Sequence, residues 1–250
     1  ILVSIVGNES ITDFNRGKGV HKIIMNNIQI IKKQGFNGEL IARMVITKGS
    51  NLYDQVLWLL NNGFDNIHWQ LDVMFYDEEN IQWLNEYNQH ITKLMDFWIE
   101  NIKQGKVIRL YPFIIIMDDM LKNKSSNLRC GSGHSNYTIL TNGKIVPCPI
   151  MQGMKQFYCG DLNSKLLKEF ELKSPCDDCD IKTICGGRCL YSNYMSSWKS
   201  ASKAEVCNTV RYLIKELQRN KLLIEQLISK NIIKLEDFSH LKYNGVEVIP

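Results

Sequence analysis

The spacing of the cysteines constrains this chain more than any other feature of its sequence. All eight cysteines fall between Cys130 and Cys207, in the second half of the 250 residues. Seven of them, with one glycine, follow the order C-x12-G-x4-C, then C-x2-C-x5-C-x3-C, then a last cysteine after seventeen residues. Short spacings of this kind are typical of disulfide frameworks and of metal sites.

A turn-rich segment separates the first two cysteines of the pattern. It contains Asn142-Gly143 between alternating residues, which predicts a β-hairpin with Asn-Gly at its turn. Cys130 and Cys148 stand at the two ends of this hairpin, so they can converge on one metal. The next four cysteines occupy fourteen residues with charged and glycine spacers. Such short knuckles direct several sulfurs toward one point.

Three kinds of crosslink fit cysteines at these spacings. Disulfides are common in small secreted domains that lack a core, but 250 residues with 44% hydrophobic content can bury a core without them. A zinc ribbon usually has two C-x2-C knuckles at regular spacing, and this chain has one. Iron–sulfur ligation accommodates irregular spacing and a cytosolic setting. The spacing therefore favours iron–sulfur clusters, while zinc and disulfides stay open.

The seven-cysteine pattern resembles the SPASM domain, which carries auxiliary clusters in radical SAM enzymes that modify peptides and proteins. The match covers roughly the second half of the chain. The resemblance implies two [4Fe–4S] clusters whose ligands interleave along the sequence. The ligands of the first cluster would be Cys176, Cys179, Cys185 and Cys207. The ligands of the second would be Cys130, Cys148 and Cys189.

The second of these clusters would lack a fourth protein ligand. Sulfatase-maturing relatives have a further cysteine just upstream of the first, whereas no cysteine precedes Cys130 in this chain. The cluster would then have an open iron site or recruit the eighth cysteine, Cys159. A buried core thiol beside Gly160 is the alternative for Cys159.

The first half of the chain alternates between apolar strands and amphipathic helices. The expected strands are residues 1–6, 40–46, 67–73 and a buried strand at 107–117 that is broken by Pro112. The expected helices lie between Gly17 and Gly35, from the N-cap candidate Asn51 to Asn62-Gly63, and from Asp77 to about Lys103. This alternation argues for a parallel sheet of βαβ units, too few to close a barrel. A further helix is expected in the second half, from Thr209 to Lys230, packed on the barrel or, as the alternative, on a partner.

The segment after the first strand resembles the S-x-D-G … D-x-x-R segment of radical SAM half-barrels, with Val6 where many relatives have Asp. The matched residues are Ser4 and Arg16, and the resemblance implies that they bind the carboxylate of S-adenosylmethionine. A guanidinium can form paired hydrogen bonds with a carboxylate while a strand-end hydroxyl donates beside it. An exposed loop arginine is the alternative for Arg16.

Polar residues alternate along the third expected strand. His68, Gln70 and Asp72 project to one face of it. Because parallel strands are usually covered on both faces, we expect this face to line the barrel lumen, where His68 and Gln70 would contact cofactor or substrate. Arg43 on the neighbouring strand is a candidate of the same kind. The alternative is an amphipathic strand with a solvent-facing side.

Radical SAM chemistry needs a C-x3-C-x2-C motif, which this chain lacks. We expect that motif and its third cluster on about three βα units upstream of Ile1, which would leave this chain inactive by itself. A degenerate homologue that cannot cleave the cofactor is the alternative. In relatives that mature sulfatases, an Asp that acts as a general base directly follows the hairpin cysteine. In this chain, Pro149 follows Cys148. No catalytic residue is therefore assigned.

Composition gives no sign of nucleic-acid binding or of a membrane span. A formal net charge of +4 with 22% charged residues gives no sign of a nucleic-acid arm. No long uncharged apolar run indicates a membrane span. Reduced cysteines without a signal peptide predict a cytoplasmic protein.

The fold class implied by these patterns and the resemblance is α/β. It comprises the C-terminal part of a (β/α)6 radical SAM partial barrel at residues 1–117, a linker at 118–129, a small cysteine-rich SPASM domain with a β-hairpin and helices at 130–208, and a C-terminal helix and tail at 209–250. The implied activity is hydrogen abstraction from a peptide or protein side chain by a 5′-deoxyadenosyl radical, as in the maturation of ribosomally made peptides. An electron donor such as ferredoxin or flavodoxin would be a second partner. A non-catalytic iron–sulfur electron-transfer or binding module and a zinc-stabilised interaction domain are the alternatives.

Overall fold

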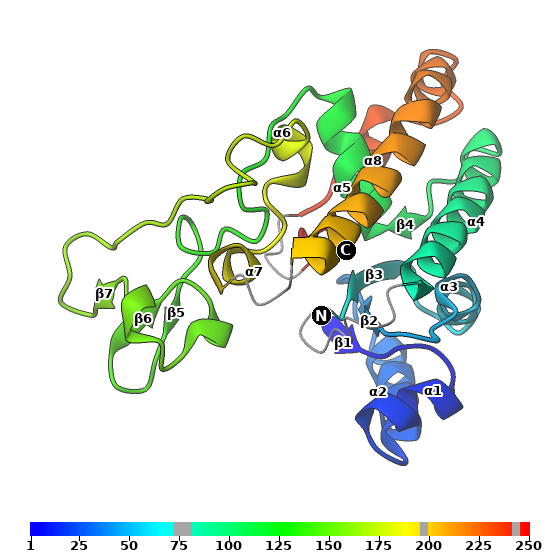
Figure 1. Cartoon of the computed structure of the whole chain (residues 1–250). Helices are drawn as coiled ribbons and strands as arrows, with labels where there is room; N and C mark the ends of the chain where they lie inside the picture. Colours follow the sequence, from blue (N-terminus) through cyan, green and yellow to red (C-terminus); the bar gives the residue numbers. More distant parts are fainter. Residues whose placement is uncertain (73–81, 196–199, 242–245) are drawn as a thin grey trace.

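The computed structural model describes residues 1–72, 82–195, 200–241 and 246–250, without the side chains of 200–203. A larger part contains a four-stranded sheet with helices, and a smaller lobe contains a three-stranded sheet among loops (Figure 1). The helix cap expected at Asp77 lies outside the described residues.

The larger part is formed by both ends of the chain. Its elements are β1 (Leu2–Ser4), α1 (Glu9–Arg16), α2 (Val20–Lys33), β2 (Ile41–Ile46), α3 (Leu52–Asn61), β3 (Asn66–Leu71), α4 (Trp83–Lys103), β4 (Arg109–Leu110), α5 (Tyr111–Leu121), α8 (Ser200–Ser229) and the short helix η3 (Leu235–Phe238). The segment between them contains β5 (Thr138–Ile139), β6 (Lys144–Val146), η1 (Pro149–Met151), η2 (Lys155–Phe157), β7 (Gly160–Asp161), α6 (Lys182–Cys185) and α7 (Leu190–Met195).

The main sheet has the strand order β1-β2-β3-β4, and each neighbouring pair is parallel. The parallel sheet predicted from the alternation of strands and helices is confirmed. Side chains alternate between its faces, and one face, which includes Met44 and Trp69, is buried in the main core. The other face carries Ser4, Arg43 and His68 in one row, because these residues are register partners.

The helices α2 and α3 agree with the sequence prediction, but α1 was not predicted. Asn51 begins α3 as expected, since its side-chain oxygen accepts a hydrogen bond from the Asp54 amide at 3.1 Å. Asn8 caps α1 in the same way, accepting from the Ile11 amide at 3.2 Å. The eight residues of α1 contain too few apolar positions to show a helical period. This helix ends at Arg16, which therefore lies on a helix and not in a loop.

The buried strand predicted at residues 107–117 is wrong. Only Arg109–Leu110 pairs with the sheet, and the chain then enters the helix α5, which extends into the expected linker. Pro112 lies in the first turn of α5, where a missing amide hydrogen costs no helical hydrogen bond. Nearly every residue of α5 is buried, so its sequence lacks the apolar and polar alternation that distinguishes a surface helix from a strand.

The helix α8 packs along α4 and α5 (Figure 1). Val210, Leu213 and Leu217 are buried in the main core, as the apolar face of the predicted helix requires. The Tyr212 hydroxyl lies 2.6 Å from the Thr92 hydroxyl on α4. The helix begins at Ser200, earlier than predicted, and therefore includes Cys207.

The smaller lobe is built on the predicted hairpin. β5 and β6 are antiparallel, and Gly143 has a φ of 76° at the turn between them. The Leu140 amide donates to the Lys144 carbonyl across this turn at 2.8 Å. A third strand, β7, pairs antiparallel with β6. A small separate core under the sheet includes Phe157 and Phe170.

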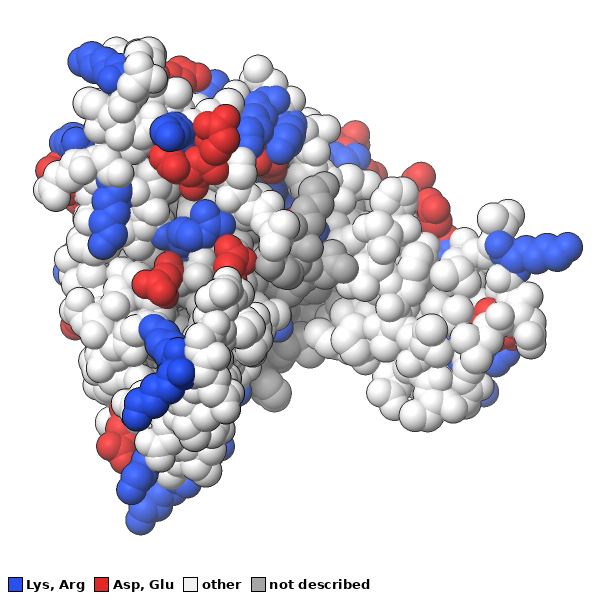
Figure 2. All heavy atoms as spheres, turned by 180° about the vertical axis from the view of Figure 1, so that it is seen from behind, with Lys and Arg blue, Asp and Glu red and all other residues white. Residues whose placement is uncertain are grey.

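Charged side chains of both signs are interspersed over the face of the larger part shown in Figure 2. No helix among the described residues is long and apolar enough to cross a membrane.

Candidate functional site

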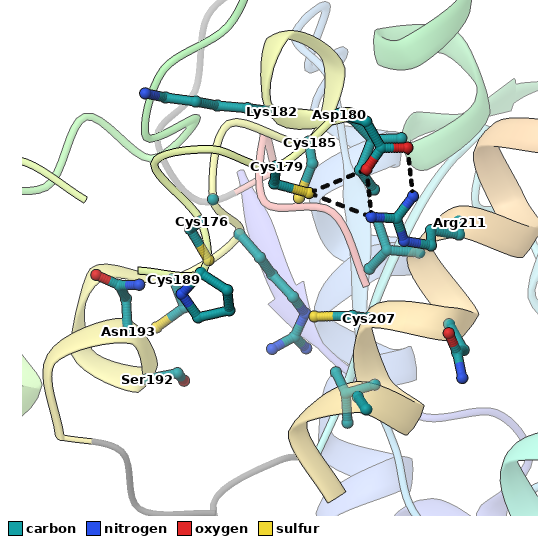
Figure 3. Close-up of a pocket in the computed structure, with 18 of the residues that line it drawn as sticks. Cys176, Cys179, Asp180, Lys182, Cys185, Cys189, Ser192, Asn193, Cys207 and Arg211 are labelled. Atoms are coloured by element: carbon teal, nitrogen blue, oxygen red, sulfur yellow. Dashed lines mark hydrogen bonds and ion pairs between the residues drawn. The ribbon is translucent and has the colours of Figure 1, made fainter. Parts of the chain in front are cut away.

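A cavity of about 790 Å³ lies between the cysteine-rich loops and the first turns of α8 (Figure 3). Five cysteines line it: Cys176, Cys179, Cys185, Cys189 and Cys207. Four of them come from the loop segment between Ser174 and Cys189, and Cys207 comes from α8. None of the eight cysteines forms a disulfide.

A left-handed turn separates Cys185 from Cys189. α6 ends at Cys185, and the next three residues, Gly186, Gly187 and Arg188, have φ values of 67°, 79° and 54°. A Cβ on Gly187 would lie 2.2 Å from a methyl carbon of Leu172, so only glycine fits there without displacing that side chain. This turn directs the two thiols into different surroundings.

The thiol of Cys185 lies near that of Cys207. Burial raises the pKa of Cys185, and the charge of Cys207 raises it further. Arg211, one turn after Cys207 on α8, donates from Nη2 to Cys179 Sγ at 3.4 Å and from Nη1 to Asp180 Oδ2 at 2.7 Å (Figure 3). The hydrogen bonds from Arg211 lower the pKa of Asp180 to about 2.

Cys130, Cys148 and Cys189 form a second group of thiols. Burial raises the pKa values of Cys130 and Cys148, and the charge of Cys189 raises both further. The backbone at Ser132 acts in the opposite direction on the pKa of Cys130, and the backbone at Ile150 on the pKa of Cys148, which favours their thiolate forms.

Cys159 lies in different surroundings. It is 5% exposed within the core of the lobe, and its Sγ lies 3.7 Å from the Phe157 carbonyl oxygen, to which it donates. Burial raises its pKa to about 11, and no other cysteine is among the groups that shift this pKa. These contacts match the buried core thiol that was the alternative for Cys159.

The thiols do not converge on a single point. Within the described part of the chain, no three side chains of His, Cys, Asp or Glu are placed to hold one metal ion. Thiolates are soft ligands that suit iron–sulfur clusters or zinc. In a cubane cluster each thiolate binds a different iron, so its ligands stand apart, whereas the thiolates on one zinc ion must all lie about 2.3 Å from it. The thiols around the cavity are ligands of the type that an iron–sulfur cluster or zinc would need.

The polar face of the main sheet brings together the other predicted site residues. Arg43 Nη2 donates to Gln70 Oε1 at 3.2 Å, and Ser4 lies beside Arg43 on the neighbouring strand. Burial lowers the pKa of Arg43, and the positive charge of Arg16 lowers it further, so the two guanidinium groups are near each other. Two adjacent cations beside a hydroxyl can bind an anion such as a carboxylate.

His68 is covered by the C-terminal segment 246–250. Its side chain is 0% exposed, and its Nε2 lies 3.2 Å from the Val248 carbonyl oxygen. Burial lowers the pKa of His68 to about 3, and the charge of Arg43 contributes in the same direction. The imidazole is therefore neutral at pH 7 and donates from Nε2. No pattern in the sequence indicates this contact across the fold.

Two arginines and one carboxylate at the cavity were not among the predicted site residues. Asp180 follows Cys179 directly, and Arg188 precedes Cys189, so their proximity to the cysteines in sequence could have identified them. Arg211 lies within the helix that was predicted from Thr209 to Lys230. Its role depends on the start of α8 passing the cysteine loop, which the sequence does not reveal.

No protein-family model matches the chain. A protein of Archaeoglobus fulgidus described as uncharacterized is 26% identical over 178 residues, which are 61% of this chain and 42% of that protein. The chain thus spans less than half the length of this curated relative.

Solved structures share the fold. The structure of hexahistidine-tagged anSMEcpe with bound AdoMet aligns with a TM-score of 0.67 at 14% identity, covering 96% of this chain and 69% of that one. Native anSMEcpe with AdoMet and the Kp18Cys peptide aligns with a TM-score of 0.67 at 15% identity, covering 90% and 68%. The chain therefore has the radical SAM/SPASM fold that the resemblance predicted.

Proposed function

We propose that this chain is part of a radical SAM/SPASM enzyme that modifies a peptide or protein, and that its cysteines hold two auxiliary [4Fe–4S] clusters. The grouping of the thiols carries the proposal. Cys130 and Cys148 lie near Cys189, whereas Cys185 lies near Cys207. Cys185 and Cys189 are close in sequence but belong to different groups, as the interleaved ligation of SPASM domains requires.

Each cluster has its own ligands in this proposal. Cys176, Cys179, Cys185 and Cys207 hold the first, at the cavity between the loops and α8. Cys130, Cys148 and Cys189 hold the second, with the backbone at Ser132 and Ile150 favouring the thiolate forms of Cys130 and Cys148. Hydrogen bonds to cluster sulfurs and solvent exposure adjust the reduction potentials.

The polar face of the sheet is the proposed site for S-adenosylmethionine. Arg16 would form paired hydrogen bonds with its carboxylate, and the Ser4 hydroxyl would donate beside it. Arg43, held by Gln70, would add a second positive charge on the same face. His68, neutral and covered by Val248, would lie beneath this site and would not contact the cofactor.

S-adenosylmethionine, when bound and cleaved by one electron to methionine, would supply the 5′-deoxyadenosyl radical that abstracts hydrogen from the substrate. Solved structures of the same fold contain AdoMet and a bound peptide, which supports a peptide substrate for this protein. An electron donor such as ferredoxin or flavodoxin would supply electrons to the clusters. The auxiliary clusters would accept an electron from the substrate or bind it directly.

Metal analysis tests this proposal. After anaerobic reconstitution, the chain is expected to be brown and to contain about eight irons with matching sulfide, the content of two [4Fe–4S] clusters. Cys179→Ala should remove roughly half of the iron, because it takes one thiolate from the first cluster only. Cys159→Ala should leave the iron content unchanged if that thiol belongs to the core, and should lower it if the thiol is a ligand.

A zinc-stabilised interaction domain makes a different prediction. Colourless protein with stoichiometric zinc would refute the clusters. Equal loss of all iron in Cys179→Ala and Cys189→Ala would refute their assignment to separate clusters.

A further inference from the structure

Arg188 lines the cavity, together with the four cysteines of the first group and Cys189 of the second. Its charge acts on Cys185 and Cys207, which belong to one group, and on Cys189, which belongs to the other. The arginine is held there by the left-handed turn between Cys185 and Cys189. Among the described residues that line the cavity, Arg188 is thus the cation whose charge acts on thiols of both groups.

Arg188 is half-buried and lacks the partners that an arginine in such surroundings normally has. Its Nε atom is shielded from solvent, with no hydrogen-bond partner among the described residues. Among the described residues, no carboxylate forms an ion pair with Arg188. The groups whose charges favour its protonated form are the three thiols and the Tyr87 hydroxyl. Partial removal of a cation from water without a counter-charge is unfavourable.

The backbone at Arg188 is also strained. Its φ of 54° is in the left-handed region, where a residue with a Cβ costs roughly 1–2 kcal/mol. Burial lowers the pKa of the guanidinium, and negative charge on the neighbouring thiols opposes that shift. The unpaired charge and the backbone strain of Arg188 are offset only when the surrounding thiols are thiolates, as they are in iron–sulfur clusters.

We propose that Arg188 is a positioning residue that serves as the shared counter-cation of both auxiliary clusters and raises the reduction potential of each. This inference rests on the proposed function. Accepting one electron from an external reductant makes a cluster more negative by one charge. A nearby cation in a medium of low dielectric constant therefore stabilises the reduced form more than the oxidised form.

Arg211 provides a matched control. Its guanidinium also faces thiols, but those are Cys179 and Cys207, which belong to the first group alone. It is also neutralised in part by its ion pair with Asp180. Removing its charge should affect one cluster, whereas removing the charge of Arg188 should affect two.

The test is a redox titration with dithionite, followed by electron paramagnetic resonance, of the anaerobically reconstituted chain. Arg188→Gln should shift the midpoint potentials of both clusters to more negative values. Arg188→Lys keeps the charge and should leave both close to those of the unchanged protein. Arg211→Gln should shift only one. Iron content and circular dichroism are measured for every variant.

The outcomes separate the two proposals. Unchanged potentials in a loaded Arg188→Gln protein, or a shift of one potential only, would overturn the role of Arg188. If Arg188→Gln does not load iron, Arg188→Lys decides: normal loading and potentials support the counter-cation, and an equal loss of iron overturns it. Absence of clusters from the unchanged protein would instead refute the proposed function itself.

Discussion

Gly187 offers the sharpest test of how the cysteine loops are packed. In Gly187→Ala, the new Cβ would lie 2.2 Å from Leu172 Cδ1, 2.5 Å from Cδ2 and 2.9 Å from Cγ. Leu172 is itself buried, so its whole side chain has to move. Overpacking of this kind costs about 1–3 kcal/mol. The φ of 79° adds roughly 1–2 kcal/mol for a residue with a Cβ. The free energy of unfolding should therefore fall by about 2–5 kcal/mol in total.

Gly153→Ala separates the two contributions. Gly153 has a φ of 80°, almost equal to that of Gly187, but no atom lies within 4 Å of its added Cβ. It should lose only the roughly 1–2 kcal/mol of backbone strain. Urea unfolding under anaerobic conditions, followed by tryptophan fluorescence, measures both variants. If Gly187→Ala is no less stable than Gly153→Ala, the close packing of the turn against Leu172 is wrong.

Two further predictions concern the larger part. The unfolded chain takes up a proton on His68 below pH about 6.5, while the folded chain does so only near its lowered pKa of about 3. The contribution of His68 to the free energy of unfolding is therefore fully present above pH 6.5. Below that pH, the free energy of unfolding should fall by about 1.4 kcal/mol per pH unit. His68→Phe should flatten this dependence in urea unfolding at several pH values, and an unchanged slope would contradict it. Exposed His134→Gln is the control. Asn51→Ala should destabilise α3 by about 1 kcal/mol through loss of its cap, whereas Asn51→Ser keeps a capping oxygen and should lose less; equal thermal unfolding of both variants would refute the cap.

The parts of the fold that the sequence predicted depend on local patterns. Alternating apolar segments predicted the parallel sheet, Asn51 predicted the start of α3, and Asn142-Gly143 predicted the hairpin. The prediction failed at α5, because a helix buried on all sides has no polar face and therefore no helical period. Pro112 then indicated a broken strand, although proline is also favoured in the first turn of a helix.

The candidate site shows the same limit at longer range. Cysteine spacing indicated a metal or cluster site, and the resemblance to SPASM domains implied which thiols would group together. It could not reveal Arg211 beside Cys179, because this contact requires α8 to pass the loop from the other side. Nor could it reveal that Val248 covers His68, a contact between residues 180 positions apart. Such contacts depend on the completed packing of the chain.

The helix α8 makes the cysteine site and the sheet mechanically one body. It carries Cys207 near its beginning and packs against α4 and α5 further along. A helix of 30 residues is about 45 Å long and resists stretching, because every turn is closed by hydrogen bonds. It therefore fixes the position of the Cys207 thiol relative to α4 and α5. An electron that passes between the cluster proposed at Cys207 and the polar face of the sheet would therefore cross a gap of fixed width.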